Sequence, residues 1–586
     1  MEEFPLHVLR DYALIADGER GALIGPRGDI VWMCAPRWGS DAVFSRLIGG
    51  EGIYAITPTD TFVWGGHYED GSLVWRSRWV TNSGITECCE ALAFPADPSR
   101  LVVLRQVVAR QGPARVKVVL DPRAGFGRYG LRSLKHDDDG IWTARVGDLY
   151  LRWSGAVEAA SVARRGRRSR LELMLSVPPG DCRNFVLEMS SRPLEDKPPD
   201  TGRLWNVTRA TWAEEIPPLE GAIAVHDARS SLVVLRGLTA STGGMVAAAT
   251  MSLPERAEQG RNYDYRYAWI RDQSYAGQAA AAAGAYRVVD AAVRFITERL
   301  HSDGPKLAPA YTVDGQPVPE QRGLDLPGYP GGFDIVGNWV KRQFQLDGLG
   351  EALQLLAAAA RCGRLDDEGV AAAEIAADAI AQRWQEPDAG IWEIDNQRWT
   401  HSRLTCVAGL RAAARHCGAR SHVTAWSGLA DAILARTAKE AMHPSGRWQR
   451  SPDDPALDAA LLLPPVRGAL PADDPRTQET LRAYAGALTE HGFAYRFQPD
   501  ERPLGEAEGA FLLCGFFMAL ALHQQGEQVE AARWFERTRS SCGVPGLFSE
   551  EYDVTERQLR GNLPQAFVHA TMLESAVRLA GPWAQP

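Results

Sequence analysis

Residues 273–300 read QSYAGQAAAAAGAYRVVDAAVRFITERL, a run in which alanine and larger apolar residues recur at helical spacing. The pattern predicts a helix. It returns in six later segments that are separated by loops rich in Gly, Pro and Asp: 350–361, 366–384, 402–416, 477–489, 510–525 and 565–579. Some 350 residues of mostly paired helices exceed a simple bundle. We therefore expect a solenoid or a closed double-helical barrel over residues 236–586.

The chain before residue 200 has a different pattern. Four segments alternate or run apolar for five to seven residues between turn residues: 115–121, 149–153, 171–177 and 184–188. Several such strands predict an antiparallel β-sandwich over residues 1–200. Residues 201–235 are expected to be a helical linker. The predicted fold is thus multidomain, with an all-β domain followed by an all-α domain.

The composition excludes several classes of protein. Apolar residues make up 45% of the chain and charged residues 23%, which excludes a disordered or fibrous chain. The net charge of −9 provides no basic excess for a phosphate backbone, so we expect no nucleic-acid partner. The longest apolar run, 510–522, is shorter than the about 20 residues that span a bilayer, so we expect no membrane. The 18 tryptophans are a weak indication of flat sugar-binding faces.

Cysteine usage and the first residues bear on the compartment. The nine cysteines are odd in number and form no Cys-x-x-Cys pair, so neither a disulfide framework nor a thiolate zinc site is expected. The N-terminus is acidic and lacks an apolar signal core. We therefore expect a cytoplasmic protein, and the sequence leaves a homo-oligomer open.

Several reaction classes lack their motifs. Residues 125–130 match G-x-G-x-x-G, but a turn follows them instead of the helix that would hold a pyrophosphate. The chain has no Walker A loop, no His-Glu-x-x-His and no Gly-x-Ser-x-Gly, and its 12 histidines are scattered. Phosphoryl transfer, zinc hydrolysis and serine-nucleophile chemistry are therefore disfavoured, and no metal site is expected.

The densest polar and aromatic segment is RNYDYRYAWIRD, residues 261–272, directly before the alanine-rich helix. Tyr265 and Trp269 supply aromatic faces for a sugar ring, and Arg271 and Asp272 supply a charged pair for its hydroxyls. The structural alternative is an Arg–Asp pair that only fixes the loop. The number of aromatic and charged residues in one loop favours a sugar-binding role.

Two further segments supply carboxyl groups. Glu393 lies between Trp392 and Ile394, where an apolar, aromatic setting would raise its pKa as a general acid requires. Residues 548–553, FSEEYD, contain Glu550 and Glu551. Glycoside hydrolysis needs one protonated and one ionised carboxyl group at the scissile bond. Taken singly, each of these residues reads more simply as an ordinary surface carboxylate.

At these segments the chain resembles glycoside hydrolase family 15, the glucoamylase and bacterial trehalase family. The resemblance extends over nearly the whole chain through an ordered series of modest motifs: 10–17, 28–37 with Phe44, 261–272, 337–338, 343–347, 505–511 and 561–567 with His569. The resemblance implies an N-terminal β-sandwich and a C-terminal (α/α)6 barrel with the active site at its mouth.

The resemblance also implies the roles of individual residues. Glu393 takes the place of the general acid, Glu550 that of the general base, and Arg271 with Asp272 that of the pair gripping the non-reducing glucose. The substrate-binding candidates are completed by residues near these motifs: Tyr265, Trp269, Trp392, Glu508, Glu551 and His401. Glu508 is also an outside candidate for the base.

The implied reaction is hydrolysis of a small α-glucoside from its non-reducing end, with inversion. The substrate would be trehalose or a short α-gluco-oligosaccharide. The two carboxyl groups should then lie about 6.5–9.5 Å apart, with room for a water molecule between them. This chemistry needs no cofactor. The sequence departs from fungal glucoamylases at Ile394, where they carry a second Glu, and Trp339, Lys341 and Arg342 point to an unusual leaving-group side.

Two alternatives remain at this stage. One is an inverting glycoside phosphorylase on the same barrel, which the acidic loop around Glu550 disfavours because it would repel phosphate. The other is a sugar-binding protein without activity, which the presence of both carboxyl groups disfavours.

Overall fold

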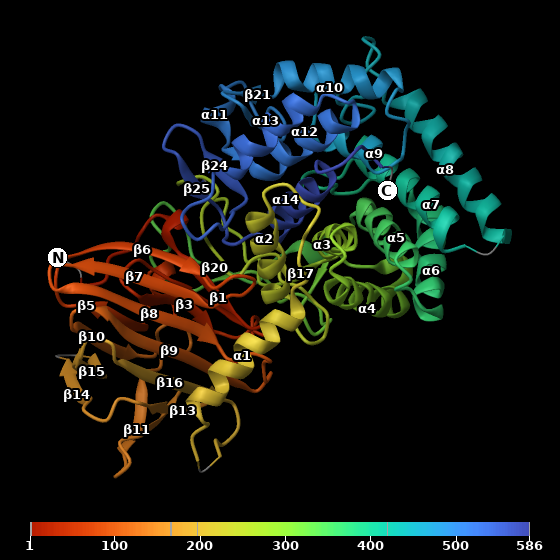
Figure 1. Ribbon diagram of the computed structural model, residues 1–586. Helices are drawn as coiled ribbons and strands as arrows, with labels where there is room; N and C mark the ends of the chain where they lie inside the picture. Colours follow the sequence, from red (N-terminus) through yellow and green to blue (C-terminus); the bar gives the residue numbers. More distant parts are fainter. Residues whose placement is uncertain (1–2, 165–166, 196, 259, 419, 585–586) are drawn as a thin grey trace.

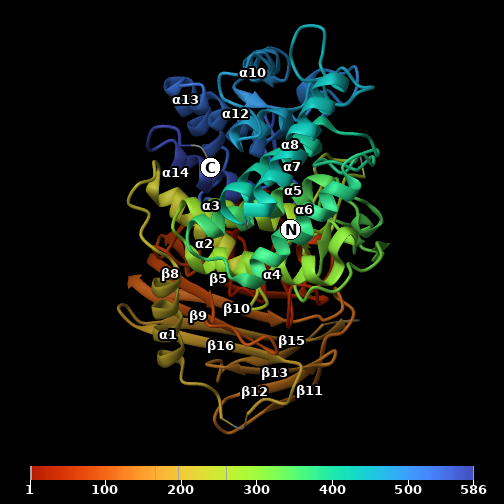
Figure 2. The same cartoon turned by 90° about the vertical axis from the view of Figure 1, so that its right-hand side faces the viewer.

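The computed structural model describes residues 3–164, 167–195, 197–258, 260–418 and 420–584. The chain forms two parts that lie side by side, strands at the N-terminal end and helices at the C-terminal end (Figure 1). Turned by 90°, the strands form one block and the helices another stacked on it (Figure 2). None of the helices in the described ranges is long and apolar enough to cross a membrane.

The N-terminal part consists of two antiparallel eight-stranded sheets. One has the order β1-β2-β3-β5-β10-β15-β14 with β4 beside β3, and the other β11-β12-β13-β16-β9-β8-β7-β6. The strands are β1 (Ala13–Ala16), β2 (Gly21–Ile24), β3 (Asp29–Cys34), β4 (Ala42–Phe44), β5 (Ile53–Pro58), β6 (Phe62–Tyr68), β7 (Trp75–Thr81), β8 (Gly84–Leu92), β9 (Arg100–Gln111), β10 (Ala114–Asp121), β11 (Leu131–His136), β12 (Trp142–Val146), β13 (Leu149–Ser154), β14 (Ala160–Arg164), β15 (Arg167–Val177) and β16 (Cys182–Ser190).

Large aromatic side chains fill the core of this domain. Trp75, Trp79 and Trp153 are at most 1% exposed and belong to the same apolar cluster. Each indole N–H has a partner: Ser77 Oγ at 2.9 Å, the Pro26 carbonyl at 2.8 Å and Tyr54 Oη at 3.3 Å. Burial without a lost hydrogen bond makes these rings stable core residues, and it accounts for part of the high tryptophan content.

The C-terminal part is helical: α1 (Thr201–Glu215), α2 (Val225–Leu238), α3 (Ile270–Ala282), α4 (Tyr286–Asp303), α5 (Leu346–Arg361), α6 (Asp367–Arg383), α7 (Thr400–His416), α8 (Arg420–Glu440), α9 (Leu463–Val466), α10 (Pro475–Ala487), α11 (Leu504–Ala507), α12 (Leu512–Gln524), α13 (Gln528–Arg539) and α14 (Ala566–Arg578). Helices α3, α5, α7, α9, α12 and α14 contact one another in this order, and α14 returns to α3. Within the described ranges they form a closed inner ring.

A second helix packs outside most members of the ring. Helices α4, α6, α8 and α13 lie against α3, α5, α7 and α12, and α2 lies against α14. The 3-10 turn Ala459–Leu462, which leads into α9, contacts α10. The inner helices are buried on nearly every face, as α12 shows with its run of Leu, Phe, Met and Ala. This arrangement explains why their sequences are apolar throughout.

One helix prediction was wrong in its extent. Residues 273–300 form two helices, α3 and α4, because the chain turns at Gly284 from the inner ring to the outer one. Gly284 adopts a φ of +68°, a left-handed conformation that residues other than glycine adopt at a cost. An alanine-rich pattern does not reveal this turn, because the residues on both sides of it are good helix formers.

The two parts share a core. Trp32 on β3 points out of the sandwich, and its indole N–H donates to the Ala249 carbonyl at 2.8 Å. Helix α1 covers the same region, where Trp212 packs against Phe94 with ring centroids 4.8 Å apart. The sandwich thus serves as a platform for the helical part.

Candidate active site

A cavity of about 180 Å³ opens at one end of the inner ring. Its lining residues lie in the first turns of α3, α12 and α14 or in the loops that precede the inner helices. The positive ends of these helix dipoles favour negative charge there. Seven of the ten predicted site residues line the cavity: Tyr265, Trp269, Arg271, Asp272, Trp392, Glu393 and Glu550.

Glu393 is held by the predicted sugar-binding loop. Its Oε1 accepts a hydrogen bond from the Trp269 indole N–H at 2.7 Å and another from Arg271 Nη2 at 3.4 Å. The side chain is 25% exposed. The backbone has a φ of +56°, which costs a non-glycine residue about 1–3 kcal/mol and is typical of functional sites. The setting is therefore polar and cationic, which corrects the apolar one that we expected.

Glu550 lies deeper in the cavity. Its Oε2 lies 3.2 Å from the Tyr265 hydroxyl, which donates to it, and its Oε1 accepts from Gln565 Nε2 at 3.0 Å. Burial and a neighbouring carboxyl group, that of Glu255, raise the pKa of Glu550 well above its ordinary value. One loop thus contacts both carboxyl groups, Glu550 through Tyr265 and Glu393 through Trp269.

The predicted charged pair is present at the start of α3. Arg271 Nε lies 3.3 Å from Asp272 Oδ2, and both residues line the cavity. Burial, opposed by Arg271, raises the pKa of Asp272 to about 6. Arg271 also donates to the Ile391 carbonyl at 2.9 Å, so it fixes the loop that carries Glu393. The structural alternative therefore holds for Arg271, and its binding role stays a prediction.

Three predicted site residues do not line the cavity. Glu508 is 1% exposed and forms ion pairs with Arg261 and Arg496. Glu551, on the strand β24 (Glu551–Asp553), accepts a hydrogen bond from the Gly509 N–H. His401 lies on α7 behind the Glu393 loop, beside Thr405. Burial lowers the pKa of His401 to about 3, so it is a neutral core histidine. The positions of these three residues outside the lining speak against direct contact with a sugar.

Sequence reasoning missed several residues that line the cavity. They are Glu255, Arg261, Tyr263, Arg496, Phe497, Gln565 and Phe567. Arg261, Tyr263, Gln565 and Phe567 lie inside motifs that were recognised as a whole, so a closer reading could have found them. Glu255 and Arg496 carry no such signal, because each stands alone in a loop and reaches the cavity only through the fold.

The leaving-group side is less unusual than the sequence suggested. Trp339 and Ile394 line the cavity, and Trp339 is 45% exposed at its mouth. Lys341 and Arg342 are outside the lining and pair with Glu320 at 2.9 and 3.0 Å. Of the three residues singled out between 339 and 342, only Trp339 lines the cavity.

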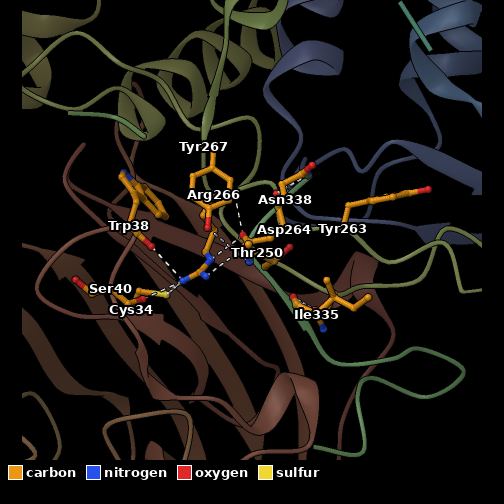
Figure 3. A network of polar contacts seen from close by, with 12 residues as sticks. Cys34, Trp38, Ser40, Thr250, Tyr263, Asp264, Arg266, Tyr267, Ile335 and Asn338 are labelled. Atoms are coloured by element: carbon orange, nitrogen blue, oxygen red, sulfur yellow. Dashed lines mark hydrogen bonds and ion pairs between the residues drawn. The ribbon is translucent and has the colours of Figure 1, made fainter. Parts of the chain in front are cut away.

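The sandwich supports the site from behind without lining the cavity. Figure 3 shows Arg266, in the middle of the predicted sugar-binding loop, pointing toward Trp38 and Ser40 of the N-terminal domain. Its Nη1 donates to the carbonyls of Ser40 at 2.9 Å and Trp38 at 3.2 Å, and its Nη2 donates to Asp264 at 2.7 Å. In the described ranges, every lining residue belongs to the chain after residue 246.

Comparison with known proteins places the chain in a family. The model of glycosyl hydrolases family 15 matches residues 233–577, and that of the trehalase-like N-terminal domain matches residues 6–158. The chain is 29% identical to a trehalase of Mycobacterium tuberculosis over 98% of this chain and 90% of that one. It is 27% identical to trehalase 1 of Sulfolobus acidocaldarius over 98% and 99% of the two chains.

The fold is also that of a solved structure. A bacterial glucoamylase complexed with acarbose matches with a TM-score of 0.70 at 15% identity, over 99% of this chain and 96% of that one. This likeness and the closed ring confirm the predicted fold class, a β-sandwich followed by an (α/α)6 barrel. Because the family model covers more than half of the chain, the chain belongs to glycosyl hydrolases family 15 and is a glycoside hydrolase.

Proposed function

We propose that this enzyme hydrolyses α,α-trehalose with inversion, with Glu393 as general acid and Glu550 as general base. One observation carries the proposal. Two carboxyl groups line one cavity, and donors four residues apart in a single loop, Tyr265 and Trp269, hold them. The trehalases similar to this chain over nearly its full length support the choice of substrate.

In the proposed reaction, protonated Glu393 gives its proton to the glycosidic oxygen while the bond from this oxygen to C1 breaks. Its Oε1 accepts two hydrogen bonds, so Oε2 is the oxygen that carries the proton. Glu550 takes a proton from a water molecule whose oxygen bonds to C1 on the opposite face. The attacked ring leaves as β-glucose and the other ring as α-glucose.

The lining of the cavity supports a small sugar substrate. Aromatic rings and charged groups line it together, as the binding of a sugar ring requires. Arg271 and Asp272 supply donors and acceptors for the hydroxyls of that ring. The second ring would then lie toward the mouth, where Trp339 offers an exposed aromatic face.

The test uses the two isosteric variants Glu393→Gln and Glu550→Gln. We expect each to lose at least about 10³-fold in kcat on trehalose with an unchanged thermal unfolding midpoint. Proton NMR of the wild-type enzyme should show β- and α-glucose forming in equal amounts before mutarotation. Two molecules of α-glucose would refute inversion. Activity on maltose or isomaltose without any on trehalose would refute the substrate.

The phosphorylase alternative is tested in the same experiment. Arg261 and Arg496 approach the cavity, but buried carboxyl groups surround them: Glu255, Glu508, Glu550 and Glu551. Arg261 and Arg496 are already paired with Glu508, which weakens both as partners for phosphate. β-Glucose 1-phosphate in phosphate buffer would establish the phosphorylase in place of the hydrolase.

Three further statements belong to the proposal. We infer the domain bounds 1–200, 201–235 and 236–586 from the sequence, although α2 in the proposed linker packs on α14.

A cytoplasmic location is supported by cysteines that are all free within the described ranges. A homo-oligomer is left to measurement of the molar mass in solution.

A further inference from the structure

Glu255 is a buried carboxyl group that the proposed reaction does not use. It is 5% exposed, and it lines the cavity from the loop before the sugar-binding segment. Its backbone N–H donates to the Arg261 carbonyl at 3.1 Å, and the neighbouring Pro254 carbonyl accepts from the Gly561 N–H at 2.9 Å. The residue is thus fixed between the loop that carries Tyr265 and the segment that follows Glu550.

Glu255 contacts Glu550 directly. The two carboxyl groups lie close enough to share a hydrogen bond. Both also pack on Gly561, where a Cβ atom would lie 3.6 Å from Glu255 Cγ and 3.4 Å from Glu550 Cβ. Gly561 has a φ of +82°, so the backbone conformation favours glycine at this point between the two side chains. Two carboxyl groups form a hydrogen bond only if one of them carries a proton.

The charges around the pair favour keeping one proton on it. The charged groups around the Glu255–Glu550 pair are Arg496, Arg261, Glu551 and Glu393. The hydroxyls of Tyr263 and Tyr265 also lie near it. Arg496 and Arg261 are already paired with Glu508. Burial raises the pKa of both carboxyl groups, that of Glu255 to about 7. Tyr265 and Gln565 donate hydrogen bonds to Glu550 and so favour its ionised form, which favours the proton on Glu255. Two buried carboxyl groups in contact do not both ionise near neutral pH, as in other carboxyl dyads.

We propose that Glu255 is a positioning residue that shares one proton with Glu550 and donates it as a hydrogen bond to the ionised base. This inference rests on the proposed role of Glu550. The bond keeps the buried carboxylate of Glu550 ionised. The hydrogen bonds from Gln565 and Tyr265 orient this carboxylate. A carboxyl O–H is a stronger donor to a carboxylate than an amide or a hydroxyl is.

The proton balance follows from this arrangement. Before the reaction the pair holds one proton and Glu393 holds one. When the C1–water bond forms, the water proton passes to Glu550 and the Glu393 proton passes to the leaving oxygen. The pair then holds two protons and Glu393 none. One proton returns from the pair to Glu393 through solvent, and the starting state is restored.

The test compares Glu255→Gln with Glu255→Ala on trehalose. The glutamine keeps the volume and offers an amide N–H to Glu550, so we expect kcat to fall by less than about tenfold. Because the amide is the weaker donor, the acid limb of the kcat/KM profile should move to higher pH by about half a unit or more. The alanine offers no donor, so kcat should fall by about 100-fold with KM within threefold.

A purely structural role would give a different result. Glu351, on α5, is a matched control because it is 1% exposed, lies outside the cavity lining and has a pKa that burial raises to about 7. Glu351→Gln should change the unfolding midpoint and leave the pH profile in place. An acid limb of Glu255→Gln at or below that of the wild type would overturn the proposal. So would a soluble Glu255→Ala enzyme with kcat within threefold of the wild type.

The outcome for Glu550→Gln separates this inference from the proposed function. If that variant keeps its activity, Glu550 is not the base and the proposed function fails. If it is inactive while Glu255→Gln keeps the wild-type acid limb, only the shared proton is refuted. Should Glu255→Ala fail to fold, the isosteric Glu255→Gln still decides, because its limb moves only if the two carboxyl groups are coupled.

Discussion

The Trp269 indole donates to Oε1 of Glu393 over 2.7 Å, and it is the shortest hydrogen bond that this carboxyl group accepts within the described ranges. Trp269 itself is 2% exposed and packs edge-on against Tyr265, with ring centroids 5.5 Å apart. The carboxyl group is therefore oriented by a rigid partner rather than by a mobile side chain.

Removing this one donor should lower turnover without weakening binding. Trp269→Phe keeps an aromatic ring and loses the N–H. A hydrogen bond to a charged group is worth about 1.5–3 kcal/mol, so kcat on trehalose should fall by roughly 10- to 100-fold with KM within threefold. Trp448→Phe is the matched control, because Trp448 is equally buried and its indole N–H has no hydrogen-bond partner in the described structure. Equal kcat values for the two variants would contradict the role of Trp269.

A second prediction concerns the mouth of the cavity. Trp339→Ala removes an exposed ring, so the fold loses little, but the outer sugar ring loses its aromatic contact. We expect KM for trehalose to rise by about three- to tenfold with kcat within twofold, as for lost ground-state binding. Lys341→Ala is the control: Lys341 pairs with Glu320 outside the lining and should leave KM unchanged. An unchanged KM in Trp339→Ala would place the outer ring elsewhere.

The position of Arg266 predicts that the sandwich affects turnover from a distance. Arg266→Met releases the sugar-binding loop from the Trp38 and Ser40 carbonyls and leaves Asp264 buried without its cation. We expect a loss of about 3–5 kcal/mol in stability and at least about tenfold in kcat. The double variant Asp264→Asn/Arg266→Met removes the unpaired charge, so it should regain most of the unfolding midpoint but not kcat. A wild-type kcat in the double variant would show that the loop needs no anchor.

The sequence predicted the two-domain order and most inner helices, because apolar periodicity reports burial directly. It also predicted the residues that lie within recognisable loops, such as Arg271 and Glu550. It could not predict Glu255, which is 295 residues from its partner Glu550 along the chain. It also placed His401, Glu508 and Glu551 at the sugar, because a residue type next to a motif does not reveal which way the side chain points.

The pH dependence of stability follows from buried carboxyl groups. Burial raises the pKa of Glu351 and Asp388 to about 7 and that of Glu551 to about 8. A raised carboxyl pKa means that the folded state holds the proton more tightly, so stability falls as pH rises from the ordinary carboxyl pKa to the folded value and is level above it. The buried histidines, His401 and His569, have pKa values lowered to about 3. Their effect on the pH dependence of stability is therefore confined to pH values below about 6.5.

The unfolding midpoint should therefore fall between pH 6.5 and 8.5. Calorimetry at constant ionic strength measures this directly. Glu351→Gln should flatten the decline, since it removes one of the groups that ionise in this window. A midpoint that rises over the same range would contradict the buried, protonated carboxyl groups of the barrel.

A buried ion pair joins α14 to Arg467, the residue that follows α9 in the inner ring. Arg467 Nη2 lies 2.7 Å from Glu574 Oε2, both side chains are at most 2% exposed, and Arg578 donates to the same carboxylate at 2.7 Å. The two guanidiniums outweigh burial and lower the pKa of Glu574 to about 2. Arg467→Met leaves the buried carboxylate of Glu574 with Arg578 as its remaining cation, so it should cost about 3 kcal/mol, the low end for a broken buried pair. In Arg467→Met/Glu574→Leu no charge of the pair remains, and we expect the unfolding midpoint to recover by more than half. A double variant as unstable as the sum of its single variants would show that the two residues stabilise the ring independently.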